Sequence, residues 1–207
     1  MTLEIRGVSA GLLDEPFDLQ VRGAEPGEEL LWRARYRDDD VRVWRAAAAR
    51  AADLSSKWKP AKPSTGPQAA LGSLRPVRID VRVEAPDGRA AARTITREIL
   101  GEGVKVRQWK DLSATLHIPE GEPRATAVIE GEAHPTVAPL LASRGLLVLA
   151  VNGGLEEALE RLATVPGATE PTTLTGVPLP PNVGATDRPP QPEAWDALLE
   201  RLGARPR

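Results

Sequence analysis

The sequence contains no cysteine among its 207 residues. This absence excludes disulfide bonds, thiolate metal ligands and a cysteine nucleophile. Only two histidines are present, and aromatic residues make up 3% of the chain. Aliphatic side chains and alanine must therefore fill most of the core.

Long hydrophobic runs are also missing. The longest, Leu146–Val151, is far shorter than the roughly 20 residues that span a bilayer. The start of the chain has no basic segment followed by an apolar one, so we expect no signal peptide and a cytoplasmic location. The formal net charge of −2 gives no reason to expect nucleic acid or a membrane as a partner. We expect a globular protein without a cofactor.

Residues 1–111 show the period-two alternation of β-strands that have one buried and one exposed face. The clearest segments are Leu30–Arg37, Val77–Glu84 and Ala91–Ile99. Such short strands between turns predict a mainly β fold, an antiparallel, immunoglobulin-like sandwich of about seven strands. The segment Ala46–Ser73 fits this pattern least well, and its alanine run could form a short helix.

Residues 112–207 change pattern and predict a small α/β portion. The order of elements is strand, strand, helix, strand and helix, over Leu112–Ile118, Ala125–Glu130, Thr136–Arg144, Leu146–Val151 and Leu155–Leu162. The middle three form a βαβ unit, and Leu146–Val151 has the continuous apolar character of a parallel strand covered on both faces.

A proline-rich segment, residues 166–192, follows this α/β pattern. It holds eight of the 20 prolines in 27 residues, which predicts an extended, non-helical connector. A closing helix is expected over 192–203, with an apolar stripe formed by Trp195, Leu198, Leu199 and Leu202. A parallel sheet this small needs further cover, which predicts a homo-oligomer or a partner protein that completes it.

Five segments resemble the acyl-CoA thioesterase and bile acid-CoA:amino acid N-acyltransferase family. Gly11–Asp38 and Val77–Gln108 resemble its N-terminal sandwich. Leu112–Gly131 and Leu140–Asn152 resemble the first strands and helix of its α/β-hydrolase domain, and Pro192–Gly203 is similar to its closing helix. The resemblance implies a truncated α/β-hydrolase portion and an acyl-CoA-like ligand.

The catalytic residues of that family find no counterpart here. The resemblance implies a Ser or Cys on a strand-to-helix elbow, a later Asp and His, and a glycine-rich oxyanion loop. Gly153 and Gly154, one helix and the proline-rich segment stand where the elbow belongs. The acidic stretch Glu130–His134 replaces the glycine-rich loop, and carboxylates there would repel an oxyanion.

The leading hypothesis is therefore a catalytically incompetent relative of these enzymes that acts as a binding or interaction module. One alternative is an active thioester hydrolase or acyltransferase whose site is non-standard or completed by a partner. A second alternative is a purely structural docking module. The sequence assigns no catalytic, cofactor-binding or metal-ligating residue.

Two motifs could still carry chemistry. Gly7–Gly11 matches G-x-S-x-G around Ser9, but a loop of small residues explains it better than a nucleophile elbow does. Glu130, Glu132 and His134 would share one face of a continued strand at the ligand-binding edge of an α/β sheet. They are the best candidate ligand site, and a divalent metal would suit them, although a solvated strand end is the simpler interpretation.

The remaining polar candidates have structural interpretations. His117 alternates with apolar neighbours and is expected on the exposed face of its strand. Arg33, Arg35 and Arg37 could meet the phosphates of coenzyme A, but a solvated face paired with the nearby carboxylates of residues 38–40 is the preferred interpretation. All five tryptophans are expected to be core or docking anchors. They are Trp32, Trp44, Trp58, Trp109 and Trp195.

Overall fold

The computed structural model describes residues 2–62, 66–185 and 190–204. The chain is mainly β, as predicted, and forms two compact units. The first comprises Met1–Glu98 and Pro180–Pro192, and the second comprises Ile99–Leu179 and Glu193–Arg207. The predicted boundary after residue 111 thus lies inside the second unit, because β9 (Lys105–Trp109) pairs with a strand of that unit.

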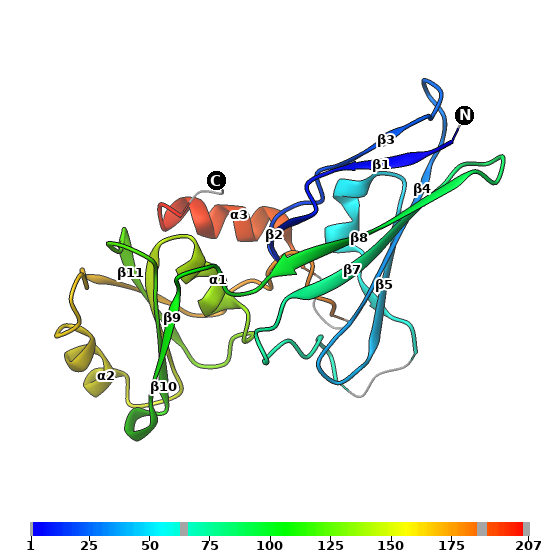
Figure 1. Ribbon diagram of the computed structural model, residues 1–207. Helices are drawn as coiled ribbons and strands as arrows, with labels where there is room; N and C mark the ends of the chain where they lie inside the picture. The colour runs from blue at the N-terminus through cyan, green and yellow to red at the C-terminus, as the bar shows by residue number, and fades with distance from the viewer. Residues whose placement is uncertain (1, 63–65, 186–189, 205–207) are drawn as a thin grey trace. The chain divides into compact units, whose positions relative to one another are not determined.

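The first unit is built on a six-stranded sheet, most of whose pairs are antiparallel (Figure 1). Its strands are, in spatial order, β2 (Ala10–Leu12), β8 (Ala90–Glu98), β7 (Val77–Glu84), β4 (Leu31–Arg37), β5 (Val43–Ala48) and β6 (Lys59–Pro60). Only β2 pairs in parallel, with β8. A separate antiparallel ribbon is formed by β1 (Glu4–Gly7) and β3 (Leu19–Arg22).

Strict alternation explains why the central strands form. Every second residue of β7, from Val77 to Val83, is buried, and the residues between them face solvent or are half-buried. The turn after β7 is closed by a hydrogen bond from the Ala85 amide to the Arg89 carbonyl at 2.9 Å. Gly88 supplies the left-handed conformation that this turn requires, at φ +88°.

A short 3₁₀ helix and the side chain of Trp58 pack on the buried side of this sheet. The 3₁₀ helix η1 (Ala51–Ser56) contacts β4 and β5 and places Leu54 in the core. The alanine run Ala46–Ala49, which the sequence suggested could form a short helix, instead forms the end of strand β5, whose last residue is Ala48. Trp58 lies nearby and meets Tyr36 in an edge-on arrangement, with 4.7 Å between ring centroids.

The proline-rich connector returns to the first unit and enters its core. All six residues of Pro180–Ala185 are buried. The Asn182 side-chain amide donates to the carbonyls of Leu13 and Glu15 at 2.6 and 2.9 Å. The Gly184 amide donates to the Tyr36 hydroxyl at 2.8 Å. This segment, here called the strap, therefore completes the first unit rather than merely linking elements.

The second unit holds a five-stranded mixed sheet. The spatial order is β13 (Pro171–Leu174), β11 (Ala125–Glu130), β12 (Leu146–Val151), β10 (Ala114–Ile118) and β9. The predicted βαβ unit is present: β11 and β12 are parallel, and α1 (Val137–Ser143) connects them. The sheet is larger than expected because the proline-rich segment supplies β13 and the supposed sandwich segment supplies β9.

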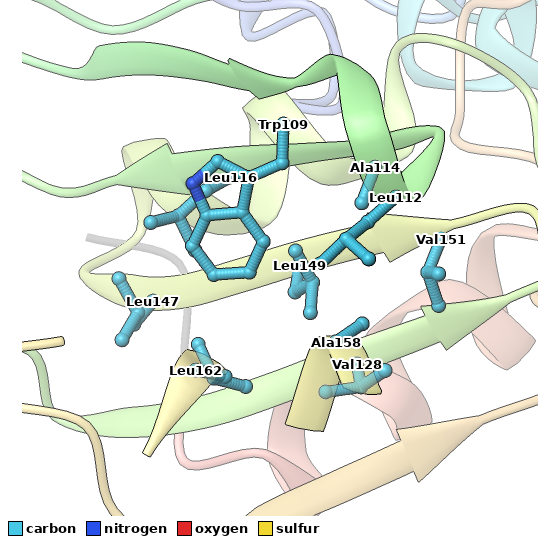
Figure 2. Packing of buried hydrophobic residues seen from close by; sticks show 10 residues of the cluster. All are labelled: Trp109, Leu112, Ala114, Leu116, Val128, Leu147, Leu149, Val151, Ala158 and Leu162. Carbon is cyan, nitrogen blue, oxygen red and sulfur yellow. The ribbon is translucent and has the colours of Figure 1, made fainter. Parts of the chain in front are cut away.

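Helix α2 (Leu155–Leu162) covers one face of this sheet. Figure 2 shows the apolar cluster beneath it, in which Ala158 and Leu162 of the helix join residues of the four strands β9, β10, β11 and β12. Leu147, Leu149 and Val151 of β12 belong to this cluster, so alternate β12 residues face α2. The intervening β12 residues point to the opposite face of the sheet, where helix α1 contacts the same strand.

The closing helix α3 (Pro192–Arg201) buries Trp195, Leu198 and Leu199, as its apolar stripe predicts. All five tryptophans are buried, which confirms their interpretation as core anchors. No helix in the described part of the chain is both long and apolar enough to cross a membrane.

Candidate binding surface

The predicted ligand site at Glu130, Glu132 and His134 lies at the carboxyl end of β11, but its residues do not share one face. The strand stops at Glu130, and Gly131 turns the backbone away at φ +82°. Both glutamates are exposed, whereas half-buried His134 places Nδ1 2.8 Å from the Thr136 hydroxyl. No three His, Cys, Asp or Glu side chains within the described residues are placed to hold a metal ion.

Ser9 is not on a nucleophile elbow. It is exposed, and its carbonyl accepts a hydrogen bond from the Thr96 amide at 2.8 Å. The segment that follows is strand β2 rather than a helix. The G-x-S-x-G string therefore lacks the strand–turn–helix geometry that exposes a catalytic serine above a sheet.

His117 corrects a prediction. It is 6% exposed, not on a solvent face. The reason is that the strand β10 is covered on both sides: Leu116 belongs to the cluster beneath α2, while α1 contacts the same strand. Burial lowers the pKa of His117 to about 4, outweighing a hydrogen bond with the Thr115 backbone. The imidazole is thus neutral near pH 7 and has no carboxylate partner among the described residues.

A more substantial feature is a hollow on the exposed face of the six-stranded sheet in the first unit, with a volume of about 850 Å³. We call it the cationic hollow. Six cationic side chains and one carboxylate line it: Arg33, Arg35, Arg45, Lys57, Lys59, Arg82 and Asp80. Six positive charges less one negative charge leave a formal charge of +5. Leu31, Ala47 and Ala92 contribute apolar surface to the same hollow.

Half of these cations have ion-pair partners from β7. Arg35 Nε lies 3.2 Å from Asp80 Oδ2, and Arg82 Nε lies 2.8 Å from Glu84 Oε1. Arg33 also approaches Glu84, at 3.5 Å. The carboxylates of residues 38–40 were expected to pair with these arginines but do not, because they lie in the turn beyond the strand. Asp38 and Asp40 contact Arg42, and Asp39 accepts hydrogen bonds from Ser73.

The other three cations have no ion-pair partner among the described residues. They are Arg45, Lys57 and Lys59. The strand register places Arg45 directly between Arg35 on β4 and Lys59 on β6. Like charges directly opposite one another in a sheet are destabilising. This cross-strand row of cations should therefore destabilise the sheet, and within the described part of the chain no carboxylate beside Arg45 or Lys59 offsets the repulsion.

Buried Asp38 holds the β4–β5 hairpin that carries this row. Its Oδ2 accepts from Arg42 Nε at 2.8 Å, Trp44 Nε1 at 3.0 Å and the Ala70 amide at 3.1 Å. Burial opposes ionisation, but these hydrogen bonds outweigh it and hold the pKa of Asp38 below its ordinary value. The hairpin is thereby anchored in the core, and Arg35 and Arg45 are held opposite each other on its outer face.

The sequence signalled only part of this surface. Alternation in β4 identifies Arg33 and Arg35, but the row depends on the pairing of β5 with β4 and β6.

No protein-family model matches the sequence, and no curated protein matches it significantly.

Proposed function

We propose that this protein is a non-catalytic binding module that recognises an anionic ligand in the cationic hollow. The observation that carries the proposal is the row Arg35–Arg45–Lys59, a cost to stability that an anion would offset. Natural proteins commonly break local rules of stability where function requires it. The exposed Ser9 loop, followed by a strand, supports the non-catalytic part of the proposal.

Descent from the thioesterase and acyltransferase family is part of the same proposal. In this interpretation, the first unit derives from an immunoglobulin-like sandwich and the second from an α/β-hydrolase domain that has lost its catalytic middle. The parallel pair β11–β12 with its crossover helix α1 is consistent with such an origin. The binding surface proposed here lies wholly in the first unit.

Arg45→Gln tests the proposal because it removes one unpaired charge and keeps most of the side chain. We expect wild-type protein to bind inorganic pyrophosphate in isothermal titration calorimetry, with an affinity that falls as salt screens the charges. Arg45→Gln should weaken binding about tenfold. The control Arg22→Gln removes an equal charge from the exposed face of β3, outside the hollow, and should bind like wild type.

The same variant makes an opposite prediction for stability. Without ligand at low ionic strength, Arg45→Gln should be at least as stable to urea as wild type, because it relieves repulsion along the row. The difference should shrink in 1 M salt. Weaker binding accompanied by a lower stability would indicate damage to the sheet and would contradict a functional role for Arg45.

A further inference from the structure

The cationic hollow has two chemically different ends. At one end, the unpaired cations Arg45, Lys57 and Lys59 lie around the short strand β6. Two residues further along β5, on the same face, is Ala47, which pairs with Arg33 of β4. Leu31 lies two residues before Arg33 and is 39% exposed. Side chains two apart on a strand are about 7 Å apart, so Ala47 adjoins the cationic end and Leu31 lies beyond it, next to Arg33.

Leu31 is unusual on this surface. Few large apolar side chains in the described residues are exposed, and Leu31 alone among them lines the cationic hollow. The small side chain of Ala47, diagonally across from it on β5, leaves space open beside it. An exposed leucine in the same hollow as the unpaired cations suits a ligand that has an anionic head and an apolar body, because each part then meets a matching surface.

The charges favour phosphate as the head group. Guanidinium groups bind phosphate oxygens through two parallel hydrogen bonds, and lysine adds a mobile point charge. Three unpaired cations exceed what a single carboxylate would neutralise, whereas a phosphate ester carries close to two negative charges at neutral pH. The volume of about 850 Å³ also exceeds the needs of a bare anion and falls within the range of small-molecule sites.

Resting on the proposed function, we propose that the hollow binds a small, soluble organic phosphate, with the phosphoryl group at Arg45, Lys57 and Lys59 and an apolar body against Ala47 and Leu31. The occupant is thus a small molecule rather than an acidic protein segment or a membrane surface. No bond is made or broken in this interaction.

A series of alkyl phosphates separates the two ends. Methyl, butyl and hexyl phosphate, below their micelle-forming concentrations, are titrated into the full-length protein by calorimetry. A fully buried methylene is worth about fourfold in affinity, so in an open hollow we expect roughly twofold per methylene. Arg45→Gln should weaken all three ligands by a similar factor, because it acts on the head group.

Leu31→Thr should leave methyl phosphate binding unchanged and remove most of the gain with chain length. The threonine retains a strand-compatible branched side chain. The matched control Val8→Thr alters another exposed apolar residue of the first unit, outside the hollow, and should behave like wild type. Folding of each variant is checked by its urea unfolding curve, so loss of binding cannot be confused with loss of structure.

Other outcomes would overturn the inference. If pyrophosphate binds through Arg45 but affinity is independent of alkyl length and of Leu31, the proposed function stands and the organic-phosphate assignment fails. Tighter binding of a polyglutamate peptide than of hexyl phosphate, or sedimentation with phosphatidic acid vesicles in the absence of soluble phosphate binding, would assign a macromolecular partner instead. If no anion binds, both proposals fail together.

Discussion

Gly184 of the strap offers a sharp test of how the first unit is held together. A Cβ added at this position would lie 2.8 Å from Cζ3 of Trp44 and closer still to two other ring carbons. Ordinary carbon contacts are about 3.5–4.0 Å. The indole is fully buried and donates from Nε1 to Asp38 at 3.0 Å, so it cannot retreat without stretching that hydrogen bond.

The backbone cannot retreat easily either. The Gly184 amide donates to Tyr36 at 2.8 Å, and its carbonyl accepts from the Ala69 amide at 2.7 Å. Overpacking a closed core costs roughly 1–3 kcal/mol. We therefore expect Gly184→Ala to lower the free energy of unfolding by about 2 kcal/mol and the melting temperature by about 4–8 °C.

Gly72→Ala is the matched control. Gly72 is exposed, and an added Cβ would meet no atom within 4 Å. Both substitutions restrict the unfolded backbone equally, so their difference isolates the steric effect. Urea denaturation followed by tryptophan fluorescence and by circular dichroism measures it. Equal stabilities for the two variants would refute the packing of the strap against Trp44.

Two further predictions concern buried ionisable groups. Between pH 6.5 and about pH 4, the unfolded chain binds a proton at position 117 that the folded chain excludes, so folding stability should fall as pH decreases, by up to about 3 kcal/mol. Comparing the pH dependence of urea unfolding with that of His117→Gln isolates this contribution, and identical slopes would contradict it. Asp38→Asn should lower the free energy of unfolding by about 3 kcal/mol in the same assay. The carboxylate accepts hydrogen bonds from donors only, and the amide NH₂ of asparagine would instead face one of these donors, on Arg42, Trp44 or the Ala70 amide. A loss below about 0.5 kcal/mol would show that this hydrogen-bond network contributes little to stability.

Local patterns were sufficient for most of the elements. Alternation in Val77–Glu84 and the continuous apolar run Leu146–Val151 correctly distinguish a half-exposed strand from one covered on both faces. His117 shows the limit of this reasoning, because alternation also occurs when two different layers cover the two faces. Whether a second layer exists depends on helix packing, which a strand's own residues do not encode.

The strap and the cationic hollow were harder to predict for a related reason. Proline content indicates an extended segment at Pro180–Ala185, but its hydrogen bonds reach Leu13, 169 residues earlier. The net charge of −2 likewise averages over the chain and conceals the +5 hollow. Both features depend on which distant segments pair, and a single sequence contains no direct signal of that pairing.

The exposed face of the first unit's sheet is the surface proposed to bind an anion. Titration of isotopically labelled protein with pyrophosphate, followed by amide NMR shifts, tests where binding occurs. We expect the shifts to concentrate in β4, β5, β6 and β7, around Arg35, Arg45 and Lys59, and to require about tenfold more pyrophosphate in Arg45→Gln. Shifts confined to the second unit, or unchanged by Arg45→Gln, would contradict anion binding at this face of the sheet.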